Sequence, residues 1–93
     1  MPAHTRATSL TNPKPDYPPI ARRRGWEGRV VIRLHVQANG VPDSVDVVES
    51  SGREMFDESA VRALKRWVFT PATRDGVPEA STVTIPVVFK LDD

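Results

Sequence analysis

The sequence contains no cysteine, only one tyrosine, and few aromatic residues overall, at 6%. Without cysteine the chain has no disulfide framework and no thiolate nucleophile or thiolate metal ligand. Because both oxidising and reducing compartments tolerate such a chain, this absence does not decide where the protein resides.

Long apolar runs are also missing. The longest are short stretches such as Val30–Ile32 and Val87–Phe89, far below the roughly 18 residues that a membrane-spanning helix requires. Residues 1–20 lack the apolar core of a signal peptide. A strong charge imbalance is absent too, because 13 Lys and Arg residues face 12 Asp and Glu residues. We therefore expect one small domain, since 93 residues suit a single core, without a surface dedicated to nucleic acid.

Residues 1–16 are rich in proline, threonine and serine and offer little to bury. This composition predicts a disordered or extended linker remnant, with the folded domain spanning residues 17–93. The arm and the residues just after it are basic, with Arg6, Lys14 and Arg22–Arg24 against one acid, Asp16.

Residues 29–38 alternate between apolar and polar side chains, as a half-buried strand does. The Asn39-Gly40 dipeptide that follows is typical of a two-residue type I′ hairpin turn. A second strand is expected over about Ser44–Glu49. In the resulting register Leu34 lies opposite Val45, Ile32 opposite Val47 and Arg33 opposite Asp46, so apolar side chains pair with apolar ones and a cation with an anion.

Two helices are predicted. A short one runs from Pro18 or Pro19 to Arg24, with Gly25 just past its end. A longer one covers about Phe56–Trp67, where apolar residues recur at helical spacing. Asp75-Gly76 then turns the chain towards a last strand.

The last strand, Thr82–Leu91, is strongly apolar yet carries Pro86 in its middle. Proline has no N–H for a sheet ladder, so this strand should lie at an edge with the missing donor facing outward. The predicted fold class is α+β: a short N-terminal helix, then β-β-α-β, with a three-stranded antiparallel sheet of order 2-1-3 covered on one face by one helix.

Several other functional sites are possible from composition, but for each of them a role without ligand binding or catalysis is favoured. Arg22–Arg24 could bind phosphate or acidic lipid, but a solvated helix end is the commoner outcome. His35 has no neighbours at metal-ligand spacing. Ser50 or Ser51 with His35 and Asp46 could form a hydrolytic triad, but no nucleophile motif supports it. We expect no catalytic, cofactor or metal site, and therefore no enzyme.

Many positions together resemble the C-terminal domain of the TonB family. They are Tyr17-Pro18, Ala21, Gly25, Gly28, Val30, Asn39-Gly40, Val45, Ser50-Ser51-Gly52, Phe56-Asp57, Ala60, Ala63, Trp67, Phe69, Pro71-Ala72, Ile85-Pro86-Val87 and Phe89. The resemblance covers about Tyr17 to Leu91.

The resemblance implies a periplasmic domain of an inner-membrane-anchored protein in a Gram-negative bacterium. Such a domain binds the TonB box of outer-membrane transporters by strand pairing and couples the proton-motive force to uptake of iron-siderophore, haem, vitamin or similar cargo. ExbB and ExbD would be partners through an anchor that this sequence lacks, which would also be the only membrane contact. The implied partner-binding residues are Lys14, Pro15, Asp16, Thr82, Thr84, Pro86, Val88 and Lys90.

An open apolar edge also permits a different role. The last strand could pair with its own copy across a two-fold axis, which would make the chain a self-associating structural module of the envelope. We expect a monomer or a weak homodimer, and a persistent dimer that ignores peptide would favour the structural module.

Overall fold

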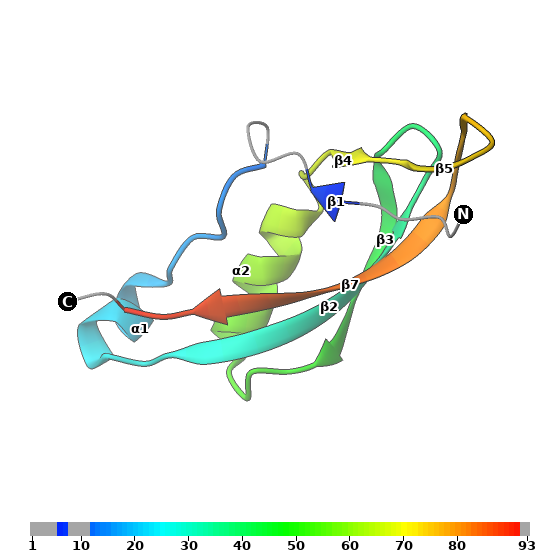
Figure 1. Cartoon of the computed structure of the whole chain (residues 1–93). Helices are drawn as coiled ribbons and strands as arrows, with labels where there is room; N and C mark the ends of the chain where they lie inside the picture. Colours follow the sequence, from blue (N-terminus) through cyan, green and yellow to red (C-terminus); the bar gives the residue numbers. More distant parts are fainter. Residues whose placement is uncertain (1–5, 8–11, 92–93) are drawn as a thin grey trace.

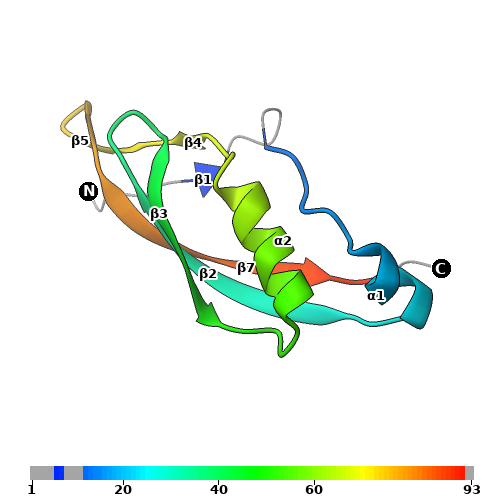
Figure 2. The same ribbon diagram turned by 180° about the vertical axis from the view of Figure 1, so that it is seen from behind.

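A three-stranded antiparallel sheet and one long helix form two layers in the computed structural model, which describes residues 6–7 and 12–91 (Figure 1, Figure 2). The sheet has the order β3-β2-β7, so β2 is central and β7 is an edge, as the sequence predicts. The elements are β1 (Arg6–Ala7), α1 (Pro19–Arg24), β2 (Gly28–Val36), β3 (Pro42–Glu49), α2 (Glu54–Leu64), β4 (Phe69–Thr70), β5 (Ala72–Arg74), β6 (Val77–Glu79) and β7 (Ser81–Phe89).

The core lies between α2 and the helix-facing side of the sheet. Strand β2 supplies fully buried side chains at alternate positions, and α2 contributes Phe56, Ala60 and Leu64. At the end of β7, Val87 and Phe89 complete this layer. The apolar side chains that recur at every second residue of the strands therefore pack against those at helical spacing on α2, in a single interface.

The predicted register of the β2–β3 hairpin is confirmed: Leu34 pairs with Val45, Ile32 with Val47 and Arg33 with Asp46. The predicted type I′ turn at Asn39-Gly40 is wrong. Gly40 has φ 87°, but Asn39 has no positive φ. The amide of Gly40 bonds to the carbonyl of Gln37 at 2.9 Å, and the amide of Gln37 bonds to the carbonyl of Val41 at 3.1 Å. These bonds define a three-residue loop in which a type I turn is followed by a left-handed glycine.

A side-chain hydrogen bond explains the difference. The Asn39 side-chain oxygen accepts a bond from the Val41 amide at 3.0 Å, a local interaction that competes with the I′ geometry. The two successive positive φ values of a type I′ turn occur instead at Asp75 (52°) and Gly76 (81°). They join β5 to β6 in a small hairpin that the sequence pattern did not predict.

Both helices begin close to their expected positions. Helix α1 ends at Arg24, and Gly25, just past its end as the sequence predicts, caps it with a left-handed φ of 71°. Helix α2 runs Glu54–Leu64 rather than Phe56–Trp67. The chain tightens at its end, because the amides of Arg66 and Trp67 bond to carbonyls three residues back. Trp67 therefore lies just beyond the helix.

Candidate functional site

Strand β7 presents an open edge whose main-chain orientation follows from the hairpin. The Gln37 amide points at β3, because it bonds to Val41. Strand β2 pairs with β7 from Gly28 to Val36 without a register shift, so its main-chain direction alternates regularly between its two neighbours. Val31, an even number of residues from Gln37, therefore also points at β3 and away from β7.

Pro86 lies opposite Val31. Its nitrogen and carbonyl consequently face away from β2, and the sheet loses no hydrogen bond to the proline. The same alternation directs the main-chain groups of Thr82, Thr84 and Val88 outward. The expected orientation of the edge is thus consistent with the observed register.

Residues 12–18, the segment before α1, lie along α2, from the C-terminal end of that helix down to α1 (Figure 1). Hydrogen-bond donors of α2 and of the residues after it hold the segment. The Val68 amide donates to the Asn12 side-chain oxygen at 2.8 Å, and the Trp67 indole N–H donates to the Pro13 carbonyl at 2.7 Å. The Ser59 hydroxyl donates to the Asp16 carbonyl. Residues 12–18 form neither helix nor strand and are attached to the domain by these bonds.

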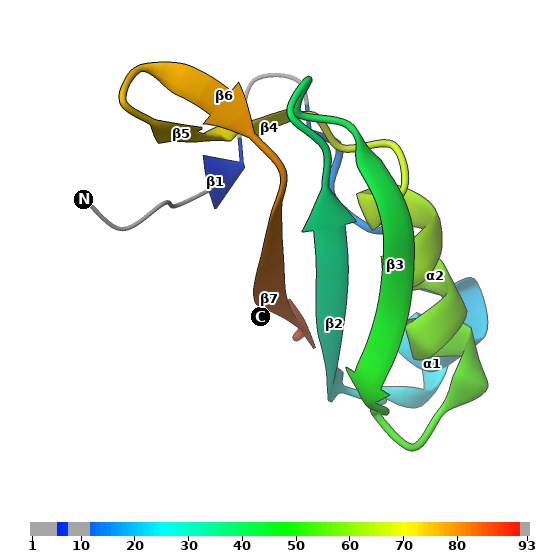
Figure 3. The same ribbon diagram turned by 90° about the vertical axis from the view of Figure 1, so that its right-hand side faces the viewer.

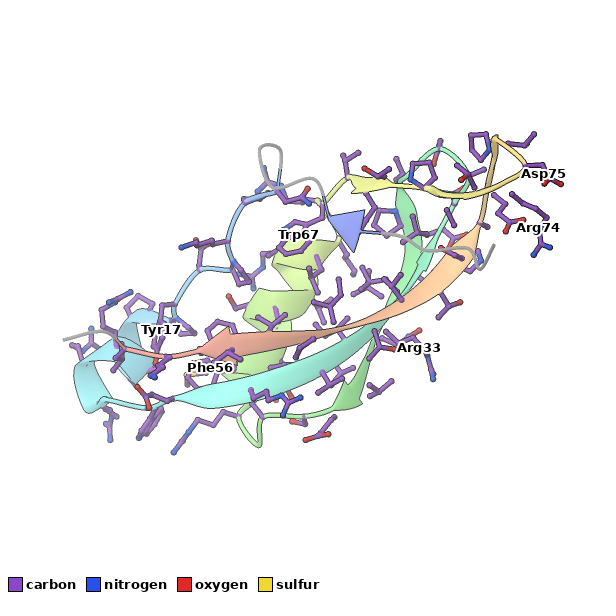
Figure 4. All side chains as sticks on the ribbon, viewed as in Figure 1. Tyr17, Arg33, Phe56, Trp67, Arg74 and Asp75 are labelled. Carbon is purple, nitrogen blue, oxygen red and sulfur yellow. The ribbon has the colours of Figure 1, made fainter. Side chains whose placement is uncertain are left out.

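Tyr17 joins this segment to the end of β7. Its ring packs edge-on against Phe56, with ring centroids 5.7 Å apart (Figure 4). It packs edge-on against Phe89 at 5.8 Å, and Phe56 stacks on Phe89 at 4.6 Å. Its hydroxyl donates to the Trp26 carbonyl. Desolvation, with a smaller contribution from the charge of Glu27, raises the pKa of Tyr17, so the phenol stays protonated and remains a donor.

A groove of about 620 Å³ lies between the segment and the end of β7. Five of the expected partner-binding residues, Lys14, Pro15, Asp16, Val88 and Lys90, line it together. The other three, Thr82, Thr84 and Pro86, continue the same edge beyond the groove. The structure therefore places the two halves of the predicted site, distant in sequence, side by side.

Tyr17, Arg22 and Trp67 also line the groove, and sequence reasoning did not assign them to it. Trp67 is partly buried against the core, and its indole N–H is directed to the arm. The Arg22 guanidinium sits over the Tyr17 ring at 4.9 Å. Because Arg22 joins Lys14 and Lys90 against a single acid, Asp16, the groove carries a net positive charge.

The alternative triad is not assembled. The Ser50 hydroxyl donates to Asp57, and the Ser51 hydroxyl donates to the same carboxylate at 2.8 Å. His35 bonds instead to Asp43 at 2.7 Å. Over residues 6–7 and 12–91 no group of three metal-ligating side chains gathers, and no helix there is long and apolar enough to cross a membrane.

The Asp57 carboxylate closes the loop between β3 and α2. Partial burial would raise its pKa, but hydrogen bonds from Ser50 and from the hydroxyl and amide of Ser51 outweigh that effect. The pKa of Asp57 therefore lies below its ordinary value of 3.8. This carboxylate acts as a structural acceptor near the start of the helix.

Fold and site together define a two-layer α+β domain with one open, regular edge strand and a basic groove beside it. The family described as Gram-negative bacterial TonB protein C-terminal matches residues 13–91. The chain belongs to this family of TonB C-terminal domains.

Individual relatives agree with this assignment. Protein tonB2 of Pseudomonas aeruginosa is 52% identical over 83 residues, covering 89% of this chain and 31% of that protein. Protein TonB of Vibrio cholerae is 44% identical, covering 85% and 32%. The solution NMR structure of the Pseudomonas aeruginosa TonB C-terminal domain matches with a TM-score of 0.77 and 31% identity, covering 96% of this chain and 88% of that one. The chain spans about a third of the length of these two sequence relatives.

Proposed function

We propose that this domain binds the TonB box of outer-membrane transporters as a strand added to β7. Main-chain hydrogen bonds would supply most of the affinity, and the side chains of the groove would select the guest. The observation that carries the proposal is the outward main chain of β7 ending beside the Lys14–Tyr17 segment. Such a site performs no chemistry and requires no cofactor.

In the whole protein the domain would lie in the periplasm and transmit force from an inner-membrane anchor. ExbB and ExbD would couple the proton-motive force to that anchor. The transmitted force would drive uptake of an iron-siderophore, haem, vitamin or similar cargo. Membership of the TonB family supports this role. The arm forms one wall of the groove, and three hydrogen bonds attach it to α2 and the residues after it. Such attachment suits a segment under tension.

Titration of the isotope-labelled domain with a TonB-box peptide tests the binding site. We expect amide shifts along Thr82–Lys90 and around Lys14–Tyr17. Val88→Pro removes one outward N–H and should weaken binding, whereas Val88→Ala keeps the main chain and should weaken it less. Unperturbed amides in both segments would refute the site.

Light scattering across a concentration series tests the alternative of self-association. A peptide-binding domain should stay monomeric at micromolar concentration or dissociate readily on dilution. A dimer that persists on dilution and ignores the peptide would instead favour the structural module that pairs through β7.

A further inference from the structure

A second groove, of about 560 Å³, lies between α2 and β3, at the edge of the sheet opposite to β7. Figure 3 shows β3 as the free edge here, with α2 packed behind it. Val47 and Val61 contribute its apolar surface, and Glu58, Arg62, Lys65 and Arg66 are among the charged residues that line it. None of these residues belongs to the β7 groove.

The main chain of β3 is available along this groove. The main chains of Val31, Arg33 and His35 in β2 point at β3, as that of Gln37 does, so those of Ile32 and Leu34 point at β7. Their partners on β3, Val47 and Val45, therefore direct their own N–H and C=O groups outward, to the free edge. Register shifts on both sides interrupt the strand and confine this regular stretch to Ser44–Val47.

The groove also has an apolar floor that nothing in the described chain covers. Val47 lies on the helix side of the sheet, opposite the buried Ile32, yet it remains 38% exposed. Val61 is half-buried and packs against the core from α2. Val47 and Val61 therefore form the uncovered apolar surface of the groove.

The charge along the groove is positive. Arg62, Lys65 and Arg66 are exposed, and no described residue forms an ion pair with them. Glu58 opposes them, while Asp57 is already occupied by Ser50 and Ser51. Cations at this end of α2 suit the helix dipole. The dipole does not account for the uncovered valines or the outward main chain that lie beside these cations.

We propose that the α2–β3 groove binds a short, extended, acidic segment of a partner protein, separately from any guest at β7. The segment would add main-chain bonds to Val45 and Val47 and place an aliphatic side chain between Val47 and Val61. Carboxylates on both sides of that side chain would face Arg62, Lys65 and Arg66. Short strand pairing would give modest affinity, and charge would decide which partner binds.

A pair of synthetic peptides tests this proposal on the folded domain. The probe is Thr-Glu-Thr-Val-Thr-Glu-Thr, whose alternate side chains are two carboxylates around one valine. The control replaces both glutamates with lysine. By fluorescence anisotropy the acidic peptide should bind, and the lysine peptide should bind at least about tenfold more weakly. Amide shifts should map to Ser44–Val47 and the end of α2.

Two charge-reversal variants give the matched comparison. Lys65→Glu with Arg66→Glu should weaken the acidic peptide about tenfold, whereas Arg23→Glu, an exposed cation on α1, should change it less than about twofold. A TonB-box peptide should neither displace the acidic peptide nor lose affinity in the double variant. Equal binding of both peptides, shifts confined to β7, displacement by the TonB-box peptide, or a dimer that occupies this face would each overturn the proposal.

Discussion

Replacing Pro86 with threonine restores the N–H that the middle of the β7 edge lacks. Because Pro86 lies opposite Val31, whose main chain points at β3, the new amide faces solvent and not β2. A strand added to β7 then gains one hydrogen bond, worth about 0.5–1.5 kcal/mol net. The dissociation constant for a TonB-box peptide should fall about two- to twelvefold, as measured by isothermal titration calorimetry. Loss of the proline should cost the fold no more than about 1 kcal/mol.

Two measurements separate the geometry from the function. Thr84→Val changes a side chain on the same edge without altering the main chain, so it should leave the affinity within about twofold. Hydrogen exchange of the new amide at position 86 should be fast in the free domain and slow with peptide bound. An amide already protected in the free domain would show that position 86 faces β2, and the argument from alternation would then be wrong. An unchanged affinity with a fast-exchanging amide would instead count against the added strand.

Two further substitutions test the turn between β2 and β3 and the loop between β3 and α2. Gly40→Ala should destabilise the domain by about 2–4 kcal/mol in chemical denaturation, because its new Cβ would clash with the Phe69 carbonyl oxygen at a φ of +87°. Gly52→Ala, at φ +89° with open space around it, should cost only about 1 kcal/mol. Asp57→Asn should cost about 1–2 kcal/mol near pH 7. Since the folded-state pKa of Asp57 lies below 3.8, its stabilisation is present above that pH and lost as pH falls through the folded-state pKa, so denaturation curves of the two proteins should converge in acid; a constant difference down to low pH would contradict this assignment.

The sheet could be predicted because its sequence signals are redundant. The hairpin register places β3 beside β2, the proline places the last strand at an edge, and apolar alternation fixes the buried face. A slip by one residue would expose every buried side chain of β2. The turn type could not be predicted from the same dipeptide, because Asn39 also bonds to Val41 through its side chain. Local competition of this kind is decided by geometry that a residue pair does not encode.

The groove was predictable in part. The half of the groove formed by β7 could be predicted from the edge strand. The other wall depends on three hydrogen bonds that hold the arm to α2 and the residues after it. No periodicity in the sequence indicates these bonds. Trp67 illustrates the difficulty. Its spacing placed it on the apolar stripe, yet the helix ends at Leu64 and the indole N–H reaches Pro13. An amphipathic side chain with one polar atom can satisfy both descriptions at once.

The two free edges of the sheet differ in a way that favours β7 for the longer guest. Strand β3 is interrupted by two register shifts, which limit any added strand to the short stretch Ser44–Val47. Strand β7 pairs with β2 over nine consecutive positions, and its only interruption as a template is Pro86. That proline divides the edge into a part beside the groove, around Val88, and a part beyond it, around Thr82 and Thr84. Lys14–Tyr17 form a second wall beside the first part, so a guest strand should be held more firmly there, and its amides should exchange more slowly than those beyond Pro86.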